Sequence, residues 1–359
     1  MSDVPAKETG RVSAAVAPTG RPQAETLLEV TGLSVDYGSG PGAVHAVNQV
    51  DFRIRRGEVI GVAGESGSGK STLAHAVTRL LRPPATVTAG QIVYHPGAEG
   101  AGPIDILEVS PEHLRRLRWE EIAVVFQSAM NALNPVIDLE SQLVDALRTH
   151  RPNVHRAART KRAAELLDLV GVSRDRLGSY PHELSGGMRQ RAMIAMALIL
   201  DPALIVMDEP TTALDVVTQR QILDELEDLR HEFGFALMFI THDLSLLLDI
   251  ADTIAVMYAG SVVELSSADQ LYSQPAHPYT QGLLRSFPSL TGPRKTLVGL
   301  PGHPPDLREL PAGCPFAPRC EHAWDRCRSS MPPLLTTAAG EPPQLAACWL
   351  HDERSSANG

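Results

Sequence analysis

The chain has 359 residues, a formal net charge of −10, 43% hydrophobic residues and only 4% aromatic residues. Its length allows one large domain with an appendage, or two domains, and its apolar content is ample for a core. The acidic balance and the scarcity of aromatic side chains argue against a nucleic-acid binder, and no apolar run approaches the ~20 residues that span a membrane.

The beginning of the chain predicts a tail followed by two strands. Residues 1–25 are rich in Ala, Pro, Thr, Gly and charged residues, so we expect them to be disordered. They lack the continuous apolar core of a signal peptide, which predicts a cytosolic protein. Leu27–Tyr37 and Val44–Ile54 alternate apolar and polar residues, as half-buried strands do, and indicate an antiparallel β-subdomain. Tyr37 is either an adenine-stacking residue or simply the end of a strand.

A phosphate-binding loop comes next. Gly64–Ser71 has the sequence GESGSGKS, a full match to G-x-x-x-x-G-K-[ST]. It lies between Glu58–Ala63, an apolar run of strand length, and Thr72–Leu81, a predicted helix. Glycines let the backbone close around a polyphosphate, and the amides of the turn and of the helix N-terminus point at the anion. Lys70 is expected at the β- and γ-phosphates and the Ser71 hydroxyl at Mg²⁺.

The following segment predicts further strands and then a helical subdomain. Apolar residues recur at four-residue spacing between Leu139 and Val170, so we expect a mainly helical subdomain at about residues 136–200. Ahead of it, we predict strands at Gln91–Tyr94, Ile104–Val109 and Ile122–Phe126, the last ending in Gln127, and a helix at Pro111–Arg118 with Ser110 as its N-cap.

Strands and helices alternate after residue 200. The predicted strands are Leu204–Met207, Phe235–Thr241 and Thr253–Met257, and the predicted helices are Thr218–Phe233 and Asp243–Ile250. This alternation implies a mostly parallel sheet covered on both faces, with ligands at the carboxyl ends of the strands. A single sheet can therefore bring together the polar residues that follow strands, namely Ser71, Gln127, Asp208, Glu209 and His242.

Asp208 and Glu209 directly follow a buried strand. The aspartate suits a contact to Mg²⁺, and the glutamate suits a base that orients and deprotonates the attacking water. Two adjacent acids at a strand end can also be solvated loop charges, but their position after a phosphate-binding loop favours the catalytic interpretation. His242 is likewise either an ordinary histidine or a catalytic one.

The motif Leu184–Gln190, LSGGMRQ, is far more specific than the phosphate-binding loop, and with it the chain resembles the ATP-binding subunit of ABC transporters. The resemblance covers roughly Leu28–Glu264 and implies a head-to-tail dimer, with each ATP held between the loop of one subunit and the LSGG motif of the other. It places Gln127 in the Q-loop, Asp215 in the D-loop and His242 as the switch histidine. The implied nucleotide contacts are Tyr37, Gly64, Ser66, Gly67, Ser68, Gly69, Lys70, Ser71, Thr72, Gln127, Asp208, Ser185, Gly186, Gly187 and Asp215; the implied Mg²⁺ contacts are Ser71, Gln127 and Asp208; and the implied catalytic residues are Glu209, His242 and Gln127.

Several phrases resemble the oligopeptide, dipeptide and nickel importer group of that family. They are NALNP at Asn131–Pro135, YPHEL at Tyr180–Leu184, HPYT at His277–Thr280 and GCPFAPRC at Gly313–Cys320. The group implies an ATPase that powers peptide import at the cytoplasmic face of the membrane. The implied partners are two transmembrane permeases, a second ATP-binding subunit and, indirectly, an extracytoplasmic binding protein, with no nucleic acid. A soluble DNA-repair ATPase, or an importer of nickel or another small solute, is the alternative.

The four cysteines, Cys314, Cys320, Cys327 and Cys348, all lie in a proline-rich C-terminal segment. A reducing cytosol disfavours disulfides, and four thiolates suit either zinc or an iron–sulfur cluster. Spacing leaves both open, with free cysteines as a further alternative, whereas the resemblance implies a 4Fe–4S cluster. We therefore expect an α/β P-loop NTPase core over residues 26–272, with antiparallel β and helical subdomains, and a small irregular metal-binding extension over residues 273–359.

Overall fold

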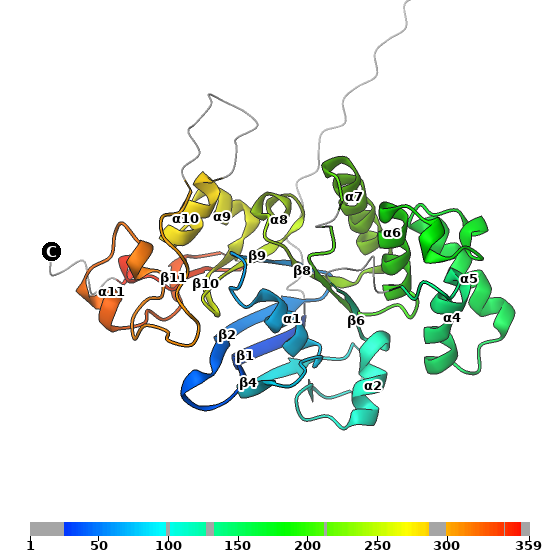
Figure 1. The fold of residues 1–359 in the computed structure, drawn as a ribbon, viewed down its shortest axis with the longest axis horizontal. Coiled ribbons are helices and arrows are strands. Elements are labelled where there is room, and N and C mark those ends of the chain that lie inside the picture. Colours follow the sequence, from blue (N-terminus) through cyan, green and yellow to red (C-terminus); the bar gives the residue numbers. More distant parts are fainter. Residues whose placement is uncertain are drawn as a thin grey trace, which may run out of the picture.

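The computed structural model describes residues 25–97, 101–126, 133–211, 214–286, 299–340 and 342–352. Most of the predicted tail lies outside these ranges. Two sheets organise the described chain (Figure 1). The smaller sheet has the order β2-β1-β4-β5 and is antiparallel throughout, which confirms the predicted β-subdomain. Its strands are β1 (Thr26–Tyr37), β2 (Val44–Arg55), β4 (Ala85–Tyr94) and β5 (Ile104–Asp105).

The larger sheet has the order β11-β12-β10-β9-β3-β8-β7-β6. The five strands from β9 to β6 pair in parallel, as predicted, whereas β10, β11 and β12 are antiparallel. The strands are β3 (Val59–Ala63), β6 (Ile122–Val125), β7 (Leu204–Asp208), β8 (Ala236–Ile240), β9 (Thr253–Tyr258), β10 (Ser261–Ser267), β11 (Leu335–Ala338) and β12 (Gln344–Ala346).

Burial on both faces explains why the parallel strands are almost continuous apolar runs. Every residue of β3, β7, β8 and β9 is buried. Successive side chains of one strand enter different cores, since they point to opposite faces. On β3, Ile60 and Val62 join the core under the β-subdomain, whereas Val59 and Ala63 join the core under the helices.

The helices cover the sheet and build the side subdomain. α4, α5 and α6 pack against one another beside the β6 end of the sheet and form the predicted helical subdomain (Figure 1). The α-helices are α1 (Lys70–Val77), α2 (Pro111–Glu120), α4 (Leu139–His150), α5 (Arg156–Leu169), α6 (Gly186–Ala197), α7 (Val216–Phe233), α8 (Leu244–Ile250), α9 (Ala268–Ser273), α10 (Pro278–Arg285) and α11 (Asp325–Ser329). Short 3₁₀ helices occur at Gly40–Gly42, Arg174–Arg176, Pro181–Glu183, Ala317–Arg319 and Trp349–His351.

Three predicted boundaries were wrong by several residues. β4 begins at Ala85, whereas we expected this strand to begin at Gln91. The expected strand Ile104–Val109 ends at Asp105, whose side chain accepts a hydrogen bond from the Leu107 amide at 2.9 Å and turns the chain. The helix after the phosphate-binding loop stops at Val77. Thr78 donates its hydroxyl to the Ala74 carbonyl, and Arg79 follows with a φ of 52°, which ends the helix.

We expected an irregular C-terminal extension, but part of it forms regular β-strands. β12 pairs with β10, and β11 pairs with β12, so the extension continues the main sheet. An exposed sheet edge favours such pairing. Glu264 of β10, fully buried, accepts hydrogen bonds from the amides of Ala276 and His277 at 2.8 Å and from the Gln344 side chain at 3.2 Å. This carboxylate therefore joins both sides of the proposed boundary near residue 272.

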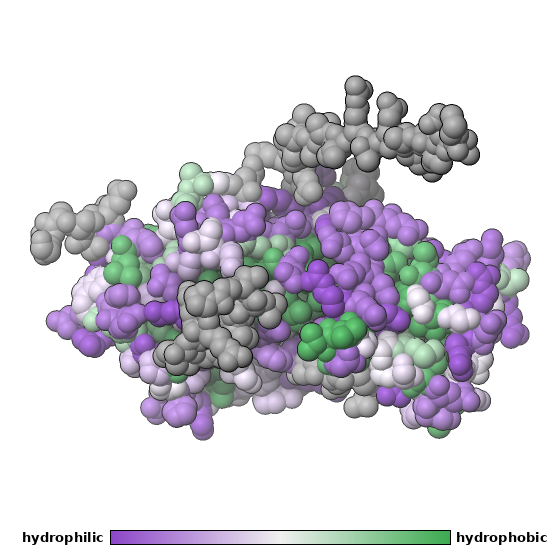
Figure 2. All heavy atoms as spheres, turned by 90° about the horizontal axis from the view of Figure 1, so that it is seen from above, coloured by the Kyte–Doolittle hydropathy of each residue, from purple (hydrophilic) through white to green (hydrophobic). Residues whose placement is uncertain are grey.

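Within the described ranges, no helix is both long and apolar enough to cross a membrane. The face seen from above is mainly hydrophilic, with hydrophobic side chains confined to separate small areas (Figure 2).

Candidate functional site

The phosphate-binding loop joins β3 to α1 and forms one wall of an open cavity of about 490 Å³. Two of its glycines are required by close packing. A Cβ atom on Gly64 would lie 2.3 Å from the Met257 carbonyl oxygen, and one on Gly69 would lie 2.1 Å from the Ala46 carbonyl oxygen. Both also have positive φ, 149° and 102°, which side chains other than glycine rarely adopt. The expected loop residues that line the cavity are Ser66, Gly67, Gly69, Lys70, Ser71 and Thr72.

Lys70 lies at the base of the loop and is only 5% exposed. Its Nζ donates to the carbonyl oxygens of Gly64 at 2.8 Å and Glu65 at 2.9 Å. Burial lowers the pKa of Lys70, and the nearby carboxylates of Glu209, Asp208 and Glu65 oppose that shift. The site thus concentrates a positive charge beneath backbone that can receive an anion. Ser68 of the loop is buried and does not line the cavity.

Asp208 ends β7 directly beside the loop and is 3% exposed. Burial raises its pKa, while a hydrogen bond with Ser71 lowers it. Its Oδ1 atom has no hydrogen-bond partner within the described part of the chain. A buried carboxylate oxygen next to a serine hydroxyl matches the hard oxygen donors that Mg²⁺ prefers, so the residues present fit the expected metal contacts.

Glu209 and His242 meet at the same edge of the sheet. The Glu209 Oε1 lies 3.3 Å from the His242 Nδ1, and Glu209 lines the cavity. The Glu209 amide donates to the Ile240 carbonyl at 2.9 Å, which fixes the residue with a φ of 46°. Such backbone strain costs of order 1–3 kcal/mol and is concentrated at functional sites.

Tyr37 lines the cavity from the end of β1, and its hydroxyl lies 3.2 Å from the Thr72 hydroxyl. The cavity wall also contains Leu307 from the C-terminal extension, which sequence reasoning missed. Glu65 of the loop forms an ion pair with Arg319 of the same extension, which was also missed. Contacts between such distant segments leave no periodic signal in the sequence.

Other expected site residues lie elsewhere. Ser185 is the N-cap of α6 and accepts a hydrogen bond from the Met188 amide at 3.2 Å. Neither Ser185 nor Gly186 and Gly187 line the cavity, and α6 is clearly separated from α1 in Figure 1. Asp215 is exposed and caps α7 through the Thr218 amide at 3.0 Å. Gln127 lies outside the described residues.

The four cysteines line one pocket of the extension, together with His277 and His322. No disulfide joins them. Burial raises the pKa of Cys314 to about 11 and that of Cys348 to about 12, and the neighbouring cysteines add to both shifts. Across the described ranges, no group of three or more His, Cys, Asp or Glu residues is arranged to hold a metal ion. The thiols are therefore gathered in one place without ligating geometry.

The cysteine pocket has a volume of about 20 Å³, which is room for about one water molecule. Its donor set suits zinc or an iron–sulfur cluster. Because an iron–sulfur cluster is larger than a single zinc ion, binding a cluster would require the residues that line the pocket to move outward further.

Two family profiles match this sequence. One, described as ABC transporter, matches residues 47–212, and the other, described as oligopeptide/dipeptide transporter C-terminal region, matches residues 263–327. The first contains the phosphate-binding loop, the LSGG motif and the Asp208–Glu209 pair, and the second contains three of the four cysteines.

Relatives and solved structures agree with these profiles. The oligopeptide transport ATP-binding protein OppD of Escherichia coli is 43% identical over 340 residues, or 94% of this chain and 97% of that protein. A putative peptide import ATP-binding protein of Brucella melitensis is 44% identical over 321 residues, or 87% and 94%. The dimeric bacterial ABC transporter cassette MJ0796 superposes with a TM-score of 0.59 at 28% identity, over 67% of this chain and 99% of that chain.

Proposed function

Because this chain belongs to the ABC transporter family of ATP-binding proteins, we propose that it is the ATP-hydrolysing subunit of a peptide importer. The observation that carries the ATPase activity is the meeting of Lys70, Glu209 and Tyr37 on one cavity at the edge of the sheet. The oligopeptide/dipeptide profile over residues 263–327 supports peptides as the cargo. It favours an importer over a soluble DNA-repair ATPase.

The residues of the cavity divide the reaction between them. Lys70 and the loop amides bind the phosphates, and Tyr37 stacks on the adenine ring. Ser71 and Asp208 would hold Mg²⁺, which neutralises phosphate charge when bound. Glu209 takes a proton from a water molecule while the water oxygen forms a bond to the γ-phosphorus. The bond between that phosphorus and the oxygen that bridges it to the β-phosphate breaks, and ADP leaves with the electron pair. His242 positions the Glu209 carboxylate.

We propose a composite site completed by a second subunit. Ser185, Gly186 and Gly187 open α6 and present backbone amides, which suit an anion, and they do not line the cavity of their own chain. Asp215 would lie at the same interface. Two permeases are the proposed membrane partners, with Gln127 and its loop carrying the motion to them and also contacting Mg²⁺. The subunit would then be peripheral, at the cytoplasmic face of the membrane.

The test is peptide-stimulated ATP hydrolysis by the complete complex. The chain is co-expressed with two permease subunits and a peptide-binding protein and reconstituted in liposomes. We expect ATP-dependent uptake of labelled peptide, lost in Lys70→Ala and kept in Lys161→Ala, a control at an exposed lysine of α5. Hydrolysis that no peptide stimulates, with uptake of nickel instead, would contradict the peptide assignment.

We also propose that Cys314, Cys320, Cys327 and Cys348 hold one metal centre, a 4Fe–4S cluster with zinc as the alternative. Support comes from the shared pocket and from its four cysteine thiols, which suit such a cluster. The pocket lies in the extension, whereas Lys70 and Glu209 lie on the nucleotide cavity, so its role is structural or regulatory.

A further inference from the structure

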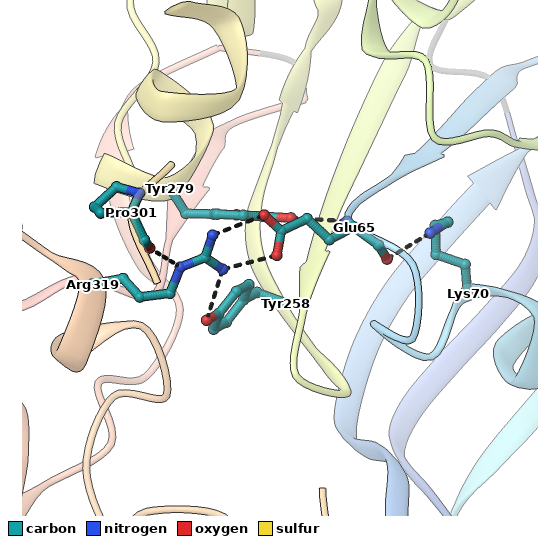
Figure 3. A network of polar contacts seen from close by, with 6 residues as sticks. All are labelled: Glu65, Lys70, Tyr258, Tyr279, Pro301 and Arg319. Atoms are coloured by element: carbon teal, nitrogen blue, oxygen red, sulfur yellow. Dashed lines mark hydrogen bonds and ion pairs between the residues drawn. The ribbon is translucent and has the colours of Figure 1, made fainter. Parts of the chain in front are cut away.

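An arginine of the C-terminal extension reaches the phosphate-binding loop (Figure 3). The Nη1 and Nη2 atoms of Arg319 donate to the two carboxylate oxygens of Glu65 at 2.8 and 3.0 Å. This is a bidentate ion pair, in which a planar guanidinium fixes both the position and the orientation of the carboxylate. The Arg319 side chain is 5% exposed and that of Glu65 is 26% exposed. The pair is therefore largely shielded from water, and salt screens it little.

Arg319 is itself held in place by the extension and the core. Its Nε donates to the Pro301 carbonyl at 2.7 Å, and its Nη1 also donates to the Tyr258 hydroxyl at 3.2 Å. Its guanidinium lies 5.7 Å from the Tyr258 ring centre and 5.8 Å from that of Phe316, within the range of cation–π attraction. The arginine therefore has one well-defined position from which to act on Glu65.

Glu65 is held from three directions at once. Arg319 binds its side chain, the Tyr279 hydroxyl accepts a hydrogen bond from its amide at 2.9 Å, and its carbonyl accepts one from Lys70 at 2.9 Å (Figure 3). Its loop contains three glycines among eight residues, GESGSGKS, and glycine-rich backbone loses the most conformational entropy when it is ordered. Fixing Glu65 restrains the loop before any phosphate arrives.

A second part of the extension reaches the other side of the cavity. Leu307 lines the cavity on which Tyr37 and Val44 lie. Its carbonyl accepts a hydrogen bond from the His45 amide at 3.0 Å, which attaches the segment to β2. Residues 299–320 thus contact two parts of the site: the phosphate-binding loop through Arg319, and the cavity wall near Tyr37 through Leu307.

We propose that residues 299–320 form a positioning element for the nucleotide site of the same chain, with Arg319 as its central residue. Arg319 holds the phosphate-binding loop in its anion-receiving conformation through Glu65, and Leu307 closes the wall beside Tyr37. Preorganisation lowers the ordering cost of binding, so the element raises affinity for adenine nucleotides. It is anchored on Glu65 and on the His45 amide, which are not among the proposed catalytic residues, so turnover at saturating ATP should be nearly independent of it. The proposal rests on the nucleotide site proposed above.

The experiment measures the Kd for a fluorescent ATP analogue on the full-length chain. We expect Arg319→Ala to raise Kd about tenfold or more and Arg319→Lys to recover part of the loss, because a lysine keeps the charge but not the bidentate geometry. Glu65→Gln should raise Kd as well, and the double variant should be no worse than Arg319→Ala alone. In ATPase assays, KM should rise while kcat stays within about twofold.

The matched control is Arg326→Ala. Arg326 lies in the same extension, forms an ion pair with Asp352 at 2.8 Å and stacks 3.5 Å from the Trp349 ring centre. We expect its Kd to equal that of the wild type, which would show that general loosening of the extension is not the cause. Wild-type Kd in both Arg319→Ala and Glu65→Gln, or fully additive losses in the double variant, would overturn the proposal. If the wild type itself binds no ATP analogue, the proposed nucleotide site fails instead.

Discussion

At the scale of the single residue, Glu209 has the geometry of a general base. Its backbone adopts a φ of 46°, and its carboxylate lies on the nucleotide cavity 3.3 Å from the His242 Nδ1. The strained conformation directs the side chain into the cavity, where a hydrogen-bonded carboxylate can accept a proton from water.

We predict that Glu209→Gln binds ATP with near-normal affinity but lowers kcat by about 10²–10⁴-fold, because the change removes the base and little else. Phosphate release and equilibrium binding of an ATP analogue measure the two effects. The variant should also accumulate as an ATP-bound dimer in size-exclusion chromatography with Mg-ATP. Glu112→Gln, at an exposed position of α2, is the control, and wild-type turnover in Glu209→Gln would refute the assignment.

Residues within short contiguous motifs were the most predictable part of the site. Lys70, Ser71 and His242 follow strands and Asp208 ends one, and a parallel sheet brings such residues to one edge. Arg319 could not be predicted in this way, because its partner Glu65 is 254 residues away. Its placement depends on how the extension folds back over the core, and tertiary packing of that kind has no local pattern.

At the scale of the element, the N-terminus of α6 is a surface feature of its own chain. Ser185 is exposed and caps the helix, and the following glycines keep the backbone accessible. The first turn of the helix therefore presents amide donors to whatever approaches the end of the helix. We propose that the nucleotide cavity of a second subunit docks against this end of the helix.

We predict that Ser185→Arg abolishes ATP-driven dimerisation and hydrolysis while leaving nucleotide binding by the monomer unchanged. The arginine adds bulk at the interface and removes an N-cap worth about 1 kcal/mol, which α6 tolerates because most of it is packed into the helical core. Ser173→Arg is the control, since Ser173 is also an exposed cap in the helical subdomain. Loss of monomer ATP affinity would place the motif in the chain's own cavity.

Element type was more predictable than element boundary. The apolar runs identified β3, β7, β8 and β9, because a strand that is buried on both faces consists almost entirely of apolar residues. The ends of α1 and β5 were set instead by side-chain hydrogen bonds from Thr78 and to Asp105, which compete locally with regular structure. The strands β11 and β12 were missed because each is short, and their pairing depends on the free edge of β10.

At the scale of the whole molecule, the extension has little core of its own. Among its described residues, the buried cluster that is separate from the main cores consists of Ala317, Cys327 and Trp349, with three partly buried neighbours. The turns around the cysteines are held by hydrogen bonds such as those from the Cys314 amide to the Cys327 carbonyl at 2.7 Å and from the Trp349 Nε1 to the Ser330 carbonyl at 2.9 Å. Small modules of this kind need a staple, which a metal centre on the four thiols would supply.

The last prediction links that staple to the nucleotide site. Arg319 directly precedes Cys320, so a change in the cysteine pocket should reach the phosphate-binding loop through the Arg319–Glu65 pair. We predict that anaerobically purified wild-type protein contains about four iron and four sulfide per chain, as four-thiolate cubane ligation requires. Cys320→Ser should lose the iron and its visible absorbance, expose the extension to protease and raise the Kd for the ATP analogue in the direction of Arg319→Ala, while the core stays folded.

The control is His322→Ala, which lies in the same pocket but carries no thiol and should keep the iron. Stoichiometric zinc with no iron, from iron-replete cells, would replace the cluster with a zinc site. Unchanged metal content and protease resistance in Cys320→Ser would refute Cys320 as a ligand, and wild-type protein with neither iron nor zinc would refute the metal centre.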